Sequence, residues 1–217
     1  MIRALAIKRE YGPTLGQLLS PRWRPASRTT RALVMAAAAG LLVLALALAL
    51  ALENAHYSRA GEVPFSFSYR GLYRAPPDAG GYVKVERLRH DGRLEDSFAV
   101  APLRLEPYAG WLVGELPVFA SSRIAALAAR YPNFVLRAEG KTRVNTVPAY
   151  QVIFTATVDG QTMFGRDVLL FAQSPHVRKG VEITMLTTPT ASRQVSSPLE
   201  VASAGLLLRP LKTFTLH

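Results

Sequence analysis

The sequence predicts an α+β domain attached to a single transmembrane helix. Residues 32–52 form an uncharged apolar run, runs that alternate polar and apolar residues fill much of 65–217, and two helix-like segments interrupt those runs. Antiparallel strands with helices between and after them are typical of α+β proteins, whose helices pack on the sheet. We therefore expect an antiparallel sheet of about six to eight strands with two packed helices.

The predicted membrane span, residues 32–52, contains only Leu, Ala, Val, Met and Gly. A helix of this length rises about 31 Å, which matches a hydrocarbon core about 30 Å thick. Ala and Leu alternate over 44–52, as they would in a strand. An isolated strand would leave its backbone unpaired in lipid, so we expect a helix with the lipid bilayer as its partner.

The charges on either side of the span predict its orientation. Residues 1–31 carry seven basic side chains and one acidic side chain, and basic segments stay on the cytoplasmic side. The sequence thus predicts a basic cytoplasmic arm (1–31), a transmembrane helix (32–52), a linker (53–64) and an extracytoplasmic domain (65–217). The alternative is a cleaved signal peptide ending near Ala51, although such peptides have shorter apolar regions of about 7–15 residues.

The predicted strands share alternation or enrichment in β-branched and aromatic residues. They are residues 65–69, 82–88, 97–107, 133–144, 149–158, 161–172, 181–188 and 212–216. The pair 149–158 and 161–172 flanks Asp159-Gly160, a strong signal for a two-residue hairpin turn.

Two helices are predicted from their caps and apolar stripes. The first covers 121–131, with Ser121 or Ser122 as N-cap and Pro132 as its stop. The second covers 198–208, with Ser197 as N-cap. Between the third strand and the first helix, residues 107–119 contain Pro and Gly and are expected to be irregular. Such a loop is the best place for a contact with a partner, and its candidate residues are Tyr108 and Trp111.

No pattern in the sequence predicts catalysis, a metal site or a bound cofactor. The chain has no Cys, which excludes disulfides and thiolate ligands. Its histidines, His56, His90, His176 and His217, lack the spacing of a zinc site. Residues 90–96 (HDGRLED) lack the order of a calcium loop, and a solvated hairpin turn explains them better.

The high charge does not predict nucleic-acid binding. The net charge is +11 and the pI about 10.4, but much of the excess lies in the arm beside the predicted span. Basic residues next to a membrane are explained by topology and anionic lipid. The remaining bases are scattered, without interleaved stacking aromatics, so we expect no nucleic acid.

Three blocks of the domain resemble the PsbP-like family, the extrinsic proteins of photosystem II and their bacterial relatives. They are FSFSYRGLYR (65–74), the hairpin block 140–171 with Gly165-Arg166, and LKTFTL (211–216) after the closing helix. Residues 89–120 depart from the family pattern. The resemblance implies an antiparallel sheet sandwiched between helices and a non-enzymatic accessory or binding role. It carries no catalytic residue across.

These observations leave three candidate functions. The first is a non-enzymatic binding or scaffold module of an envelope or membrane complex, with a protein partner and a small-molecule ligand left open. The second, an exported carrier or sensor of an apolar ligand such as a lipid, predicts an apolar pocket of about 300 Å³ or more between 121–131 and the sheet. The third, a membrane-anchored hydrolase, predicts a His within about 3 Å of a Ser or acid in a cleft.

Overall fold

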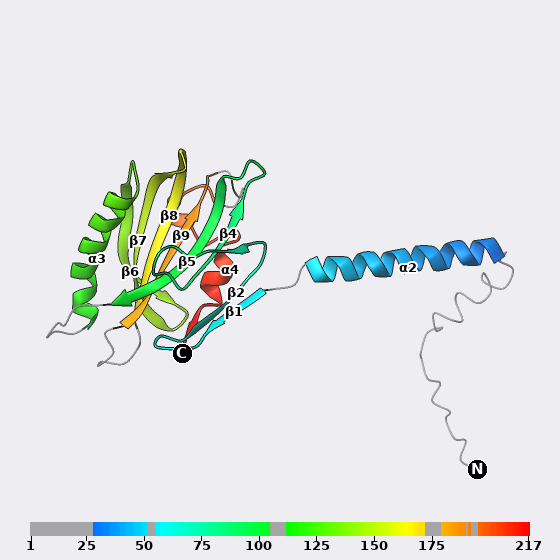
Figure 1. Cartoon of the computed structure of the whole chain (residues 1–217), viewed down its shortest axis with the longest axis horizontal. Coiled ribbons are helices and arrows are strands. Elements are labelled where there is room, and N and C mark those ends of the chain that lie inside the picture. The colour runs from blue at the N-terminus through cyan, green and yellow to red at the C-terminus, as the bar shows by residue number, and fades with distance from the viewer. Residues whose placement is uncertain (1–27, 52–54, 105–111, 172–178, 190, 192–194) are drawn as a thin grey trace, which may run out of the picture. The chain divides into compact units, whose positions relative to one another are not determined.

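The computed structural model describes residues 28–51, 55–104, 112–171, 179–189, 191 and 195–217 (Figure 1). The chain forms two compact units, Met1–Glu53 and Asn54–His217. In the first unit, helix α2 covers Arg28–Ala51, and most of the predicted span 32–52 lies within it. Judged on the described residues alone, no helix meets the length and apolarity of a membrane-crossing helix. Leu52 and the side chains of 46–51 lie outside that description.

The second unit contains two antiparallel sheets in its described residues, and it confirms the α+β class. The smaller sheet has the order β1-β2-β10, formed by Ala55–Arg59, Phe65–Tyr69 and Thr215–Leu216. Strand β2 coincides with the predicted strand 65–69. Strand β1 lies inside the segment predicted as a linker, 53–64, because its sequence AHYSR is too short and polar to stand out.

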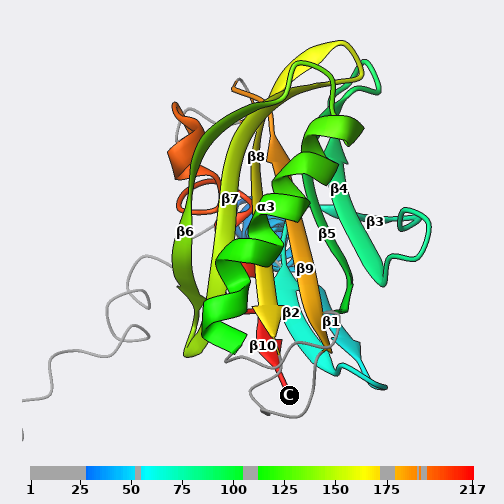
Figure 2. The ribbon, with the colours of Figure 1, turned by 90° about the vertical axis from the view of Figure 1, so that its left-hand side faces the viewer.

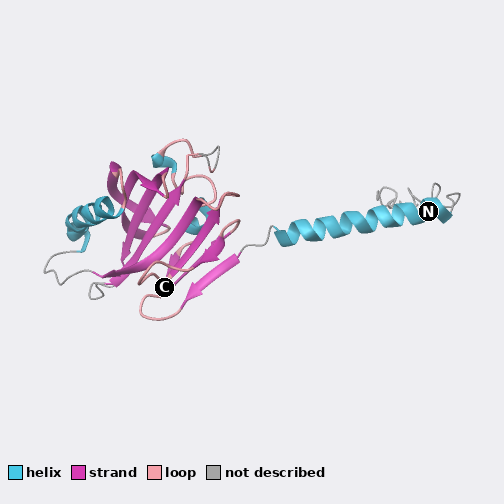
Figure 3. Cartoon of the chain, turned by 45° about the horizontal axis from the view of Figure 1, so that its top comes forward, coloured by secondary structure: helices cyan, strands magenta, loops and turns pink. Residues whose placement is uncertain are grey.

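The larger sheet has seven strands in the order β3-β4-β5-β9-β8-β7-β6. In Figure 3 the strands are magenta and the helices that flank them are cyan. Its strands are β3 Tyr73–Ala75, β4 Val83–Leu88, β5 Leu94–Arg104, β6 Val135–Val144, β7 Val147–Val158, β8 Gln161–Phe171 and β9 Lys179–Thr187. All except β3 were predicted within a few residues. The short β3 was missed because three residues give no readable alternation.

Turn chemistry accounts for two details of this sheet. Asp159 and Gly160 both have positive φ (48° and 74°), which matches the predicted hairpin turn between β7 and β8. Pro102 stands inside β5, opposite Val181 of β9. Strand β4 pairs with β5 only as far as Val100, so Pro102 sits beyond the end of β4 and costs the sheet no hydrogen bond on that side.

Helix α3 covers Leu112–Arg130, with Pro117 inside it, and begins nine residues before the predicted start at 121. The prediction was wrong because Pro and Gly in 107–119 were taken as marks of an irregular segment. The predicted N-cap residues instead lie mid-helix, where their hydroxyls donate back to carbonyls. Ser121 Oγ is 3.2 Å from the oxygen of Pro117 and Ser122 Oγ is 2.8 Å from that of Phe119.

The predicted helix 198–208 was correct only at its start. Ser197 caps a 3₁₀ turn, η1 Pro198–Glu200, and Glu200 completes a capping box. The chain then leaves the helical path, because Ala202 has φ 60°. It resumes in α4, Leu208–Lys212. Pro210 lies in the first turn of α4, where no backbone donor is needed, so the helix accommodates it.

Elements cover both faces of the seven-stranded sheet (Figure 2). Against one face, here called the sandwich face, pack the small sheet, η1 and α4, with a core rich in Phe. Phe67 lies 4.9 Å from Phe98 and 6.2 Å from Phe214 between ring centroids. Against the other, the helix face, packs α3. Its Ala120, Leu127 and the neighbouring Tyr131 join two smaller clusters with β7 and β8.

Candidate functional site

The predicted contact loop cannot be placed, because Tyr108 and Trp111 lie outside the described residues. That assignment stays a prediction. The aromatics that are described around α3 belong to the core. The ring of Phe154 lies 5.7 Å from that of Tyr131 and 5.2 Å from that of Phe134, so these rings fill the space under α3.

A cavity of about 420 Å³ opens on the helix face of the sheet, and we call it the groove. One wall is the C-terminal half of α3 with Arg123, Arg130 and the following Tyr131. The opposite wall is the turn between β3 and β4, which contributes 77–79 and Gly81. Its floor is formed by β4, β5 and β9. Since α3 packs over β6 and β7, the groove lies over the half of the sheet that this helix leaves uncovered.

The alternation of small and large side chains along β5 explains why there is space above the floor of the groove. Phe98 and Val100 are buried towards the sandwich face. The alternate residues Ser97, Ala99 and Ala101 point the other way and line the groove. Alternate residues of a strand face opposite sides of a sheet. Small side chains on the groove side therefore leave room for a ligand, while large ones on the other side fill the core.

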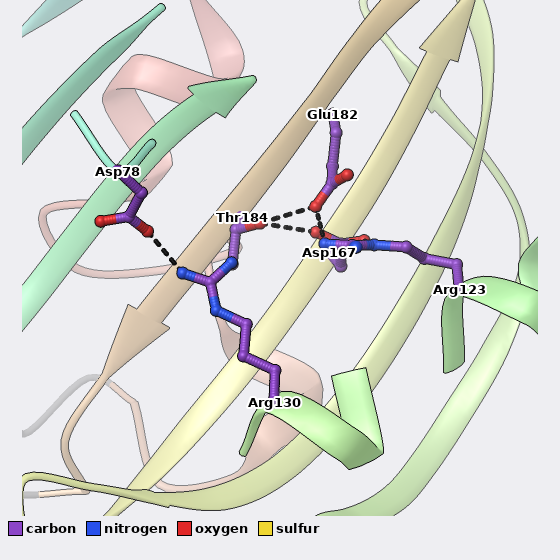
Figure 4. A network of polar contacts seen from close by, with 6 residues as sticks. All are labelled: Asp78, Arg123, Arg130, Asp167, Glu182 and Thr184. Atoms are coloured by element: carbon purple, nitrogen blue, oxygen red, sulfur yellow. Dashed lines mark hydrogen bonds and ion pairs between the residues drawn. The ribbon is translucent and has the colours of Figure 1, made fainter. Parts of the chain in front are cut away.

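A network of polar contacts lies beside α3 (Figure 4), and its members Arg123, Glu182 and Thr184 line the groove. Arg123 Nε donates to Asp167 Oδ2 at 3.2 Å, and Arg123 Nη2 donates to Glu182 Oε1. Thr184 Oγ1 lies 2.8 Å from Asp167 Oδ1 and 3.2 Å from Glu182 Oε1. Asp167 is fully buried and Glu182 is 8% exposed. One guanidinium thus pairs with two carboxylates from neighbouring strands, so its single positive charge balances only one of them if both are ionised.

The burial of this network affects protonation and stability. Burial raises the pKa of Asp167 above its ordinary value, while Arg123 and the Thr184 hydroxyl act in the opposite direction. Removing one partner of a buried ion pair typically costs about 3–5 kcal/mol. Arg123 therefore ties α3 to the sheet between the two small apolar clusters.

The rim of the groove carries a second and weaker connection. Arg130, at the end of α3, pairs with Asp78 of the β3–β4 turn (Figure 4). Their side chains are 48% and 54% exposed, and an exposed ion pair contributes only about 0–1 kcal/mol. Lys84 on β4 pairs with Glu86 at 2.8 Å. A ligand could therefore compete for Arg130 and Asp78 at little cost to the fold.

The lining does not match the predicted apolar pocket. The cavity lies beside α3, over strands that this helix leaves uncovered, and not between the helix and the sheet as expected; its volume of about 420 Å³ exceeds the expected minimum. However, six of its lining residues carry charges, namely Asp78, Lys84, Arg123, Arg130, Asp159 and Glu182. Transfer of a wholly apolar molecule into this groove would desolvate these groups without pairing them. The geometry favours a polar ligand or a polar segment of a partner.

The described histidines lie outside the groove. His56, His90 and His217 are exposed, and His176 falls outside the described residues. His217 Nε2 lies 2.9 Å from Ser66 Oγ, and His56 Nδ1 lies 3.2 Å from Ser68 Oγ, on the outer surface of the small sheet. Within the described residues no carboxylate bonds to either imidazole, so neither pair has the third member of a triad. Likewise, no described His, Asp and Glu side chains are grouped to hold a metal ion.

The sequence did not reveal the network, because Arg123 lies 44 residues from Asp167 and 59 from Glu182. One signal was nevertheless present. Asp167 and Glu182 interrupt strands whose other residues are largely apolar, DVLLF and VEITML. An acid in a strand that is buried on both faces requires a partner. That requirement alone does not say that the partner is Arg123.

Comparison with known proteins supports the fold. No model of a protein family matches the sequence, and no curated protein matches it. Among solved structures it is similar to the cyanobacterial PsbP (CyanoP) of Synechocystis, with a TM-score of 0.50 and 14% identity over 76% of this chain and 94% of that one. It is also similar to LpqN of Mycobacterium tuberculosis, involved in cell envelope biogenesis, with a TM-score of 0.49 and 7% identity over 76% and 91%. The chain has a PsbP-like fold.

Proposed function

We propose that this chain is a single-pass membrane protein whose PsbP-like domain lies outside the cytoplasm. There the domain binds a partner or scaffolds a membrane or envelope complex, without catalytic activity of its own. The groove on the helix face is the observation that carries the binding role. It offers about 420 Å³, within the range of ligand sites, and five of its six charged lining residues form ion pairs with neighbouring side chains.

The anchoring part of the proposal rests on the sequence. Residues 32–52 contain no charged or polar side chain, and the basic arm precedes them. Helix α2 spans most of this segment. A helix of such composition is stable in lipid because each Leu or Val contributes about −0.3 to −0.6 kcal/mol to insertion.

Anchoring and orientation can be tested together. We expect the full-length protein to stay with membranes after carbonate washing, and a reporter fused after His217 to be active only outside the cytoplasm. Moving the basic residues of 1–31 to positions 53–62 should invert the protein. A full-length chain in the soluble fraction would overturn the anchor, and a reporter that stays outside after the exchange would overturn the charge rule.

Site-specific crosslinking in intact cells tests the binding role of the groove. A photoreactive amino acid at Ala79, on the exposed rim, should capture a partner that mass spectrometry identifies. The same amino acid at Ala125, an exposed α3 position that does not line the groove, is the matched control. Equal capture from both positions, or none from Ala79, would contradict a binding role for the groove.

A further inference from the structure

The outer strand β6 differs from the strand at the opposite edge of the seven-stranded sheet. Strand β6 has ten residues and pairs only with β7 in the described structure, whereas β3 at the other edge has three residues (Figure 2). An unpaired edge of this length presents a row of N–H and C=O groups with which another strand can pair. The groove is not involved, since β6 does not line it.

The turn that joins β6 to β7 determines which backbone groups of β6 are available. Asn145 and Thr146 form a two-residue connection between the paired residues Val144 and Val147. The closing pair of such a hairpin exchanges both of its hydrogen bonds, and the pattern then alternates along the strand. Glu139, Lys141 and Arg143 therefore direct their N–H and C=O groups away from β7. The register is continuous from Ala138 to Val144, with a bulge only before Ala138.

The charges on this edge are unbalanced. Lys141 and Arg143 are exposed, and among the described residues neither forms an ion pair. By contrast, Lys84, Arg87 and Lys179 on other strands each pair with a carboxylate. Glu139, the one acid of β6, accepts a hydrogen bond from the Tyr150 hydroxyl at 3.3 Å. The edge therefore combines free backbone donors and acceptors with a net positive charge.

We propose that β6 receives an extended acidic segment of a partner protein as an eighth strand of this sheet. Main-chain hydrogen bonds to residues 139, 141 and 143 would supply affinity, and Lys141 and Arg143 would select acidic side chains. A second copy of this chain fits the edge less well, because two β6 strands would bring their unpaired bases together. The inference goes beyond the groove and does not depend on it.

Hydrogen exchange of the full-length protein in detergent tests this inference. The probe is a synthetic nine-residue peptide of alternating glutamate and threonine, added to about 1 mM, the weak end of measurable affinity. We expect slower exchange of amides in 138–144 with this peptide, and no change when lysine replaces glutamate. Equal protection by both peptides, or none by either, would overturn the proposal. Protection of β6 before any peptide is added, together with a dimeric mass, would assign the edge to a second copy instead.

Variants separate the backbone contribution from the charge contribution. Glu139→Ala removes an acid that repels the peptide, so binding should be unchanged or tighter. Glu139→Pro removes the same acid together with an outward N–H, and we expect at least tenfold weaker binding, although proline at this position spares the β6–β7 hydrogen bonds. Tight binding by the proline variant would contradict strand addition.

The charge contribution has its own matched pair. Lys141→Glu with Arg143→Glu should weaken binding at least tenfold. Arg209→Glu with Lys212→Glu makes the same change in net charge on exposed positions of α4 and should have little effect. If both double variants weaken binding equally, the peptide responds to total charge and not to β6.

Discussion

At the scale of single residues, the most informative group is Asp167, an aspartate with no solvent exposure on a central strand. Its pKa is raised, first of all by burial. The folded chain therefore keeps a proton on Asp167 at pH values where the unfolded chain has already lost it. The free energy of unfolding therefore falls as pH rises from the ordinary aspartate pKa to the raised pKa of Asp167.

This sign leads to a prediction for Asp167→Asn. Between about pH 4, the ordinary aspartate range, and the raised pKa, the free energy of unfolding of the wild type should fall as pH rises. The variant cannot ionise and should show a flatter profile over the same window. Urea unfolding at a series of pH values measures both profiles. Asp91→Asn, at an exposed turn, should follow the wild type; a D167N profile as steep as the wild type would refute the assignment.

Gly165 lies at a position that has no room for a side chain. A Cβ at this position would lie 2.3 Å from the ring of Phe154, its cross-strand partner. The structure shows a close approach here, because the Phe154 ring rests on the glycine. A larger residue at position 165 would fit only if the Phe154 ring moved.

We expect Gly165→Ala to lower the free energy of unfolding by about 1–3 kcal/mol through overpacking. If the ring of Phe154 is the cause, the same substitution should cost less in a Phe154→Leu background. A double-mutant cycle by chemical denaturation gives this difference directly. Additive effects of the two substitutions would exclude the contact as the reason for the loss.

At the scale of elements, strands were predicted better than helices, and the reason is physical. Strands such as β2 show their alternation in five residues, because one side is buried and the other is not. For α3, a proline was read as a helix breaker, yet Pro117 stands within the helix. After η1, the positive φ of Ala202 ends a helix that composition alone would continue. Such a turn depends on tertiary contacts, for example the Arg166 guanidinium donating to the Val201 carbonyl at 3.1 Å.

The capping box of η1 gives a prediction at this scale. Ser197 Oγ accepts from the Leu199 N–H at 3.3 Å, and Glu200 Oε2 accepts from the Ser196 and Ser197 N–H groups. Ser197→Ala should lower the free energy of unfolding by about 1 kcal/mol, the usual cost of losing an N-cap. Ser203→Ala, at a nearby exposed position, should change it by less than about 0.5 kcal/mol. Equal effects in denaturant titrations would show that the cap is not the cause.

At the scale of the whole domain, the two faces of the seven-stranded sheet have different chemistry. The sandwich face carries one large apolar cluster. On the helix face, Arg123 and its carboxylates separate two smaller clusters. The sequence predicted the sheet because periodicity is local. It predicted a pocket near 121–131 only as the consequence of one candidate function, and as an apolar one. The charged lining and the position of the groove were not predicted, because the lining residues come from distant segments that meet where one helix is too narrow to cover seven strands.

The small sheet gives the last prediction, because β1 lies in the segment that the sequence assigned to a linker. Tyr57 of β1 packs on Phe65 and Phe67, with ring centroids 5.7 and 5.4 Å apart. Arg59 of β1 lies over the ring of Tyr82 at 3.9 Å. Removal of β1 would uncover these rings and leave β2 as an edge strand.

A domain that begins at Asn54 should therefore be more stable than one that begins at Glu62, by about 2 kcal/mol or more. A true linker could be removed without loss, so thermal and urea unfolding of the two domains distinguish the alternatives. Tyr57→Ala in the longer domain should reproduce much of the loss, since the ring supplies most of the buried contact. His56→Ala keeps the strand and its packing face and should cost little. If the shorter domain unfolds at the same denaturant concentration as the longer one, β1 contributes nothing to the fold and 53–64 acts as the linker that its composition predicted.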